Sequence, residues 1–240
     1  MKTKVLSLIF MLAVIFQTKA IGSYKAGDKL TVLAKSGLTL RNNANSNGKK
    51  KTLIPFGSVV IVQTEGLMAS AHQVEEFKGY IIKGHWVKVK FGEEEGWAFD
   101  GYLSSLMVNP DLQEAKGVSS NEKDAIDALY GQNSTRKGVA KESSKDNTMT
   151  YDQDFQDGTH FTLKKYDGGS QRILTFKKGI TQEEAYLWGK SVWFPDNKVG
   201  SQKYNGNNKH IRVNGGDNDS KAMRVIPVGT RWEVHFDIAD

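Results

Sequence analysis

Three ionisable side chains alternate near the end of the sequence, and residues of these types can bind a metal ion or transfer protons. Period-two alternation places Glu233, His235 and Asp237 on one side of a predicted strand, opposite a row of apolar side chains. A half-buried antiparallel strand needs polar residues on its wet face in any case. We therefore interpret the trio as the solvent-facing side of a strand, not as a catalytic site.

The histidines do not form a pattern typical of a zinc site. They lie at His72, His85, His160, His210 and His235. Zinc hydrolases use three protein ligands, commonly His-rich and locally paired, and the sequence contains no HxH or HExxH pair. No zinc chemistry is expected.

Two acidic clusters carry the oxygen ligands that calcium prefers. The first is Asp152, Asp154 and Asp157, and the second is Asp217 with Asp219. Neither is followed by the Glu at the twelfth position that closes an EF-hand loop. Because Asp favours turns, we interpret both clusters as turns and predict no metal and no cofactor.

Several enzyme signatures are missing from the sequence. The chain has no cysteine, so it holds neither a disulfide nor a catalytic thiol. It also lacks a GxSxG nucleophile elbow and a Gly-rich phosphate cradle. A catalytic site is not predicted, although His160, His210 and His235 are available as general bases for an enzyme whose site is dispersed along the sequence.

Aromatic side chains are better candidates for a binding site. Trp86 falls on the same side as two lysines of its strand, so alternation predicts that it is partly exposed. Together with Phe99 and Tyr102 it could stack on a peptide or a sugar, and Tyr80 is expected to face Trp86. The alternative is that these rings fill the ends of a small barrel or cover one of its edges. Trp97 is expected to belong to the core.

The segment Gly84–Leu103 must position these rings, and it predicts a β-hairpin. Val87 and Val89 alternate with lysines, which indicates a strand with one wet face. A polar run at 92–95 separates this strand from a second apolar run that begins at Trp97.

Four pieces of sequence, including this hairpin, resemble the bacterial SH3 domain family. They are Leu38-Thr39-Leu40-Arg41, Gly57-Ser58-Val59-Val60-Ile61-Val62, Trp86-Val87-Lys88-Val89, and Gly96-Trp97-Ala98 with Tyr102-Leu103. The resemblance covers residues 24–106 and implies a small β-barrel over residues 21–108. Members of this family commonly target cell-wall peptidoglycan or recognise short peptides, so the resemblance implies one of these as the partner.

Two features depart from the pattern of that family. The loop Asn42–Lys51 replaces a Gly-Pro-Ser loop, and an insertion, Glu65–Lys83, lengthens the connection before Trp86. The insertion carries apolar residues, among them Phe77, that a solvated loop would not need. We expect it to fold against the barrel and to form one wall of the recognition groove.

Residues 1–20 have the pattern of an export signal. Lys2 and Lys4 precede the apolar run Val5–Phe16, and Ala20 offers a small residue at a cleavage position. The run is shorter than the ~20 apolar residues that a transmembrane helix needs. We therefore expect an exported protein of the periplasm, envelope or medium, without stable membrane insertion after cleavage.

The charge of the remaining chain is nearly balanced. Three of the 33 Lys and Arg residues lie in the predicted signal, which leaves 30 against 27 Asp and Glu. No basic face is dense enough to indicate binding of a phosphate backbone, so no nucleic acid partner is expected. The local cluster Lys49-Lys50-Lys51 is interpreted as solvating a loop.

The middle of the chain, residues 109–147, is predicted to be a linker because it is rich in polar residues and glycine. A capping box of Ser119 with Glu122 predicts a short helix over 119–130. Residues Gly131–Asn147 are expected to be mobile, since Val139 is their one buried-type aliphatic residue.

Residues 148–240 predict an α+β domain that resembles no family known to us. Strands are expected at His160–Tyr166 and Arg172–Lys178 around a glycine turn, and the capping box of Thr181 with Glu184 predicts a helix. Three more strands are expected around 210–213, 223–228 and 231–239. The predicted fold class is mainly β: an SH3-like barrel followed by an antiparallel sheet with one helix on a face.

These observations favour an exported, non-enzymatic protein that binds cell-wall peptidoglycan or a short peptide of an envelope protein. The predicted ligand-binding residues are Trp86, Phe99, Tyr102 and Tyr80. Two alternatives stay open: an envelope-associated enzyme with its site in the C-terminal domain, and a structural or adhesive envelope component.

Overall fold

Two antiparallel sheets and one α-helix make up the part of the chain that the structure describes. This computed structural model describes residues 24–63, 70–108, 130–194, 199–216 and 220–239. The predicted export signal and most of the predicted helix over 119–130 lie outside these residues. No helix among the described residues is long and apolar enough to cross a membrane.

The first sheet contains the four sequence pieces on which the SH3 resemblance rests. Its strands are β1 (Lys29–Val32), β2 (Leu38–Arg41), β3 (Lys50–Ile54), β4 (Val59–Val62), β5 (Ala71–Phe77), β6 (Tyr80–Phe91), β7 (Glu94–Phe99) and β8 (Leu103–Ser104). The strand order is β3-β2-β7-β6-β4-β1-β8, with β5 paired to β6. A short 3-10 helix, Asp100–Tyr102, joins β7 to β8.

Strand β6 is long because the insertion continues the sheet. Its second half pairs with β4 and β7, and its first half pairs with β5 in the register Ala71↔His85 to Phe77↔Tyr80. The described part of the insertion is therefore a β-hairpin that extends the first sheet.

The second sheet has the order β13-β14-β15-β16-β12-β11-β10-β9. Its strands are β9 (Arg136–Lys145), β10 (Thr148–Phe155), β11 (His160–Tyr166), β12 (Gly169–Thr175), β13 (Val199–Asn205), β14 (His210–Gly215), β15 (Lys221–Val228) and β16 (Arg231–Ala239). The predicted fold class, mainly β with an antiparallel sheet and one helix, is confirmed.

The predicted linker is wrong over 136–145, where the structure has strand β9. This strand lies at the edge of the second sheet, and its side chains are almost all exposed. Its polar sequence carries no period-two signal because neither of its faces is buried. Tyr130, the last residue of the short helix predicted within this linker, is fully buried against Phe155 and Trp188.

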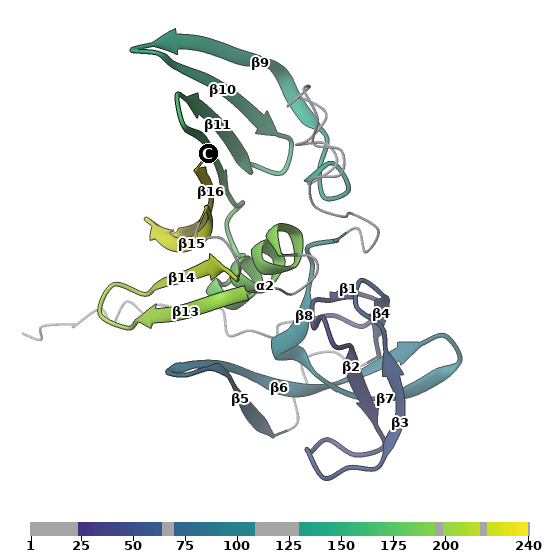
Figure 1. The fold of residues 1–240 in the computed structure, drawn as a ribbon. Helices are drawn as coiled ribbons and strands as arrows, with labels where there is room; N and C mark the ends of the chain where they lie inside the picture. Colours follow the sequence, from purple (N-terminus) through teal and green to yellow (C-terminus); the bar gives the residue numbers. More distant parts are fainter. Residues whose placement is uncertain (1–23, 64–69, 109–129, 195–198, 217–219, 240) are drawn as a thin grey trace, which may run out of the picture.

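The helix, α2 (Gln182–Trp193), lies between the two sheets (Figure 1). The predicted capping box is present: Thr181 Oγ1 accepts from the Glu184 amide at 3.2 Å, and Glu184 accepts from the Thr181 amide at 3.0 Å. One side of α2 packs on β15 and β16, where a Cβ on Gly189 would collide with Val234 and Met223. A glycine therefore lets the helix approach the sheet closely.

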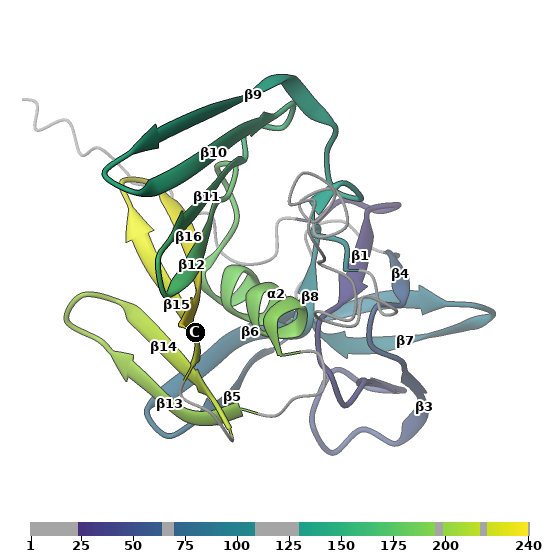
Figure 2. The same cartoon turned by 45° about the horizontal axis from the view of Figure 1, so that its top comes forward.

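The other side of α2 contacts the first sheet, as the turned view of Figure 2 also shows. Ser104 Oγ donates to Glu184 Oε1 at 2.7 Å, and Trp188 Nε1 donates to the Met107 carbonyl at 3.0 Å. The buried hydrophobic side chains of both sheets and the helix form one continuous cluster.

Candidate functional site

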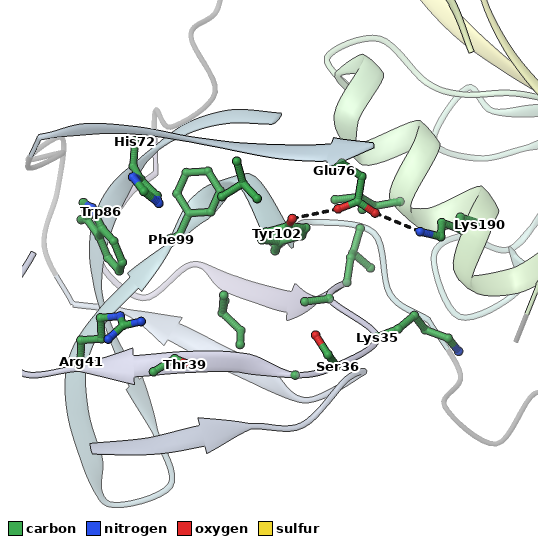
Figure 3. Close-up of a pocket in the computed structure, with 16 residues that line it drawn as sticks. Lys35, Ser36, Thr39, Arg41, His72, Glu76, Trp86, Phe99, Tyr102 and Lys190 are labelled. Atoms are coloured by element: carbon green, nitrogen blue, oxygen red, sulfur yellow. Dashed lines mark hydrogen bonds and ion pairs between the residues drawn. The ribbon is translucent and has the colours of Figure 1, made fainter. Parts of the chain in front are cut away.

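A cavity of about 330 Å³ lies where the first sheet, the insertion hairpin and α2 meet (Figure 3). Its floor comes from Leu33–Thr39 and Arg41 of the first sheet, and its far wall includes Leu187 and Lys190 of α2. This volume lies at the small end of the range of ~300–1,000 Å³ that is usual for ligand sites.

One wall of the cavity is strand β5 of the insertion. His72, Val74 and Glu76 line the cavity, while the residues between them point to the other face and are exposed. This is the period-two pattern of a strand with one covered face. The wall forms because β5 pairs with the first half of β6, which carries it over the aromatic residues of the first sheet.

At one end of the cavity, Glu76 joins three parts of the chain. It accepts a hydrogen bond from the Tyr102 hydroxyl at 2.8 Å and forms an ion pair with Lys190 of α2 at 2.9 Å (Figure 3). Only about one seventh of either charged side chain is exposed, at 14% and 13%. Burial, together with the charge of Glu76, raises the pKa of Tyr102, so this hydroxyl stays protonated.

The opposite end of the cavity is aromatic and cationic. The ring of His72 lies 5.3 Å from Trp86 and 5.0 Å from Phe99, and the Arg41 guanidinium lies 6.0 Å from the centre of the Trp86 ring. Arg41 also donates to the Gly48 carbonyl at 2.8 Å. This end can receive a planar or apolar group against the half-buried ring of His72 and an acceptor group at the guanidinium.

A buried carboxyl group holds the turn that carries Tyr102. Asp100 is fully buried and its Oδ1 accepts from the His85 amide at 2.6 Å. Burial raises the pKa of Asp100 to about 6, an effect that the His85 hydrogen bond partly opposes.

The structure places three of the four predicted binding residues around the cavity. Trp86, Phe99 and Tyr102 all line it, and the insertion forms a wall. Trp86, however, is only 4% exposed, so the predicted partial exposure is wrong. Both Trp86 and Val87 are buried, because both faces of β6 are covered at this point, and alternation cannot assign a wet face there.

Tyr80 does not face Trp86 and does not line the cavity, so that prediction is wrong. Tyr80 is 3% exposed, stacks on Phe77 at 5.2 Å, and contacts Tyr186 and Tyr204 of the C-terminal half. Tyr80 and Trp86 are six positions apart on one strand and therefore share a face. Burial raises the pKa of Tyr80, and its hydroxyl has no hydrogen-bond partner among the described residues.

Sequence reasoning missed the charged lining of the cavity. Arg41 belongs to one of the motifs that resemble the SH3 family. Nothing in the sequence around Glu76 and Lys190 indicates that these two polar residues line a cavity. Only the alternation of His72, Val74 and Glu76 within the insertion was visible in the sequence. It would have indicated a strand with one covered face.

Trp97, which we assigned to the core, is only half-buried. It lines a second, more open cavity of about 640 Å³ together with Lys50, Lys51 and Lys88. Two of these lysines are paired: Lys51 with Glu94 at 3.0 Å and Lys88 with Glu95 at 3.5 Å. Because these pairs are largely exposed, they are screened by water and salt.

The trio of the last strand lies on the face of the second sheet opposite α2. His235 is 9% exposed, so the expected solvent-facing position is wrong for this residue. Its Nε2 lies 2.9 Å from Glu233, which also accepts from Thr175, and Asp237 pairs with Arg224 at 3.0 Å. Hydrogen bonds to neighbouring strands satisfy the trio's carboxylates.

Of the acidic clusters, Asp152 and Asp154 lie beside His160, whose two ring nitrogens each face one carboxylate, at 3.4 Å and 2.8 Å. Asp157 instead accepts from the Tyr130 hydroxyl. Within the described ranges no three His, Asp or Glu side chains are grouped to hold a metal ion. Asp217 and Asp219 lie outside those ranges.

The cavity is the best candidate for a functional site, because aromatic rings, hydroxyl groups and more cationic than anionic side chains line it. Three cationic side chains, Lys35, Arg41 and Lys190, line it with one carboxylate, Glu76. Comparisons of the chain with protein-family models, with curated proteins and with solved structures found no match.

Proposed function

We propose that this chain is an exported, non-enzymatic binding protein that holds a short peptide in the cavity between β2, β5 and α2. The foremost ligand is the peptide portion of cell-wall peptidoglycan. The proposal includes a bacterial SH3-like barrel in the N-terminal half, supported by the four sequence motifs on β2, β4, β6 and β7.

One observation carries the proposal: the lining of the cavity is mixed in the way that peptide sites are. The half-buried side chains His72, Val74 and Tyr102 offer aromatic and apolar surface. Ser36 and Thr39 offer hydroxyls to a peptide backbone. A cavity of this size suits a few amino acid residues better than a folded protein surface.

The test is binding of soluble muropeptides, obtained by muramidase digestion of purified peptidoglycan, measured by calorimetry on residues 21–240. The variant Thr39→Phe fills the cavity with a ring from a half-buried position of β2. We expect it to weaken binding about tenfold or more, which corresponds to a loss of ~1.4 kcal/mol or more.

The matched control is Thr150→Phe, a half-buried threonine of β10 in the second sheet. It should leave both affinity and melting temperature near those of the wild type. If the unaltered protein binds no muropeptide, or if Thr39→Phe binds as tightly as Thr150→Phe, the cavity is not a peptide site.

A second candidate function is catalysis on the outer face of the second sheet. It is favoured by the pairs His160–Asp154 and His235–Glu233, since a histidine oriented by a carboxylate can act as a general base. Replacing His160, His210 and His235 together by Gln distinguishes the two. Muropeptide binding should persist in this variant, whereas turnover of muropeptides by the wild type that the variant lacks would favour the enzyme.

A further inference from the structure

The charged groups at the two ends of the cavity differ in their type and in their partners. At the α2 end, the carboxylate of Glu76 is engaged by Lys190 and by Tyr102. Lys35 adds a positive charge at this end, and its ammonium lies 4.2 Å from the centre of the Phe56 ring (Figure 3). At the other end the charge belongs to Arg41, and among the described residues no carboxylate lies within ion-pair distance of its guanidinium. The cavity therefore has a guanidinium at one end, and a buried ion pair with an additional lysine at the other.

The environment of Arg41 fixes the guanidinium in place. One of its amino groups donates to the Gly48 carbonyl at 2.8 Å, and Trp86 flanks the group at 6.0 Å. Figure 3 shows the guanidinium beside Trp86 and directed toward the cavity, with His72 on the opposite wall. A guanidinium has five N–H donors in a rigid fork, so several remain for a second partner.

A carboxylate is the partner that fits this fork best, because it accepts two parallel hydrogen bonds from one guanidinium. The half-buried position of Arg41 beside the Trp86 ring strengthens such a pair by reducing the access of water. In a short peptide the group that reaches the end of a small cavity is the chain terminus.

We propose that the cavity recognises a peptide by a free carboxylate, which the Arg41 guanidinium binds, with the preceding side chain packed on the half-buried ring of His72. This inference rests on the proposed function and adds the chemical group that the site selects. The peptide backbone then runs along Thr39 and Ser36 toward the Glu76 end of the cavity.

The test uses two forms of one muropeptide digest. One form is native, and in the other the carboxylates are converted to methylamides, which removes the charge and keeps the peptides otherwise the same. We expect the wild type to bind the native form at least about tenfold more tightly, as for the loss of one charge-assisted hydrogen bond. This preference should decrease as salt concentration rises.

The variant Arg41→Gln should bind both forms alike, with the affinity that the wild type shows for the methylamides. Arg212→Gln, the same substitution at an exposed position of β14, should keep the wild-type preference. Arg41 also donates to the Gly48 carbonyl, so its replacement could change the local structure and weaken binding of both forms. The readout is therefore the ratio of the affinities for the native and the methylamide form. A local structural change by itself would leave this ratio unchanged.

Equal binding of the two forms by the wild type would overturn this inference and leave the proposed function standing. Retention of the tenfold preference in a folded Arg41→Gln protein would overturn the role of Arg41. Absence of binding to both forms would overturn the proposed function itself, and this inference with it.

Discussion

Glu76 and Lys190, 114 positions apart in the sequence, form an ion pair of 2.9 Å between the insertion hairpin and α2. The same carboxylate accepts from Tyr102, so one side chain links the insertion, the first sheet and the helix. This link lies beside the wall that Leu187 and Lys190 contribute to the cavity. The cavity is thus a product of how the two halves of the chain pack.

The variant Glu76→Gln should lower the free energy of unfolding by about 3 kcal/mol, because it leaves the Lys190 ammonium largely buried without its partner. The matched control is Glu95→Gln, which removes a carboxylate from the exposed pair with Lys88 and should cost about 0–1 kcal/mol. Urea unfolding measures both. Equal midpoints for the two variants would contradict a linking role for Glu76.

Stability should also depend on the ionisation of Asp100. Its pKa is about 6 in the folded protein against an ordinary value of 3.8, so the folded state holds the proton more tightly than the unfolded state. The free energy of unfolding therefore falls as the pH rises from about 4 to about 6, and the loss of up to about 3 kcal/mol persists at neutral pH.

The variant Asp100→Asn should remove this loss, since an amide oxygen can still accept from the His85 amide. We expect it to be more stable than the wild type at pH 7 and about equally stable near pH 4. The exposed substitution Asp167→Asn controls for the change in net charge. A difference between Asp100→Asn and the wild type that is the same at both pH values would contradict the expected ionisation.

The sequence predicted β2, β4, β6, β7, β11, β12, β14, β15 and β16, but it missed others, among them β5 and β10, which each have one covered face. The sequences of β2 and the second half of β6 alternate, β4 and β7 were assigned from the family resemblance, and the capping box gave the start of α2. Strand β9 escaped detection because it is exposed on both faces at a sheet edge. Alternation also failed at Trp86, where the insertion and the core cover opposite faces of one strand.

The candidate site was less predictable than the fold, for a physical reason. Its aromatic residues lie near one another in sequence and could be grouped from a hairpin pattern. Arg41, Glu76 and Lys190 come together only through contacts between distant segments, and no local preference of the chain encodes such contacts.

Two buried tyrosines should respond in opposite ways to loss of the hydroxyl. The Tyr80 hydroxyl has no partner among the described residues, so Tyr80→Phe should leave stability unchanged or raise it by about 1 kcal/mol. The Tyr130 hydroxyl bonds to Asp157 at 2.9 Å and to Thr159 at 2.8 Å, so Tyr130→Phe should cost about 1–2 kcal/mol. Thermal unfolding measures both variants, and a larger loss for Tyr80→Phe would show that its hydroxyl has a partner.

The fragment 24–108 should fold cooperatively, because it keeps every strand of the first sheet. Its melting temperature should lie below that of residues 24–240, since removing the C-terminal half uncovers Tyr80, which contacts Tyr186 and Tyr204, and deletes Lys190. The fragment should also bind a dye specific for exposed apolar surface. Within this fragment, Glu76→Gln should have little effect on stability, although we expect it to cost about 3 kcal/mol in the full chain. An equal cost of Glu76→Gln in the fragment and in the full chain would mean that the effect arises within the first sheet and not from the contact with α2.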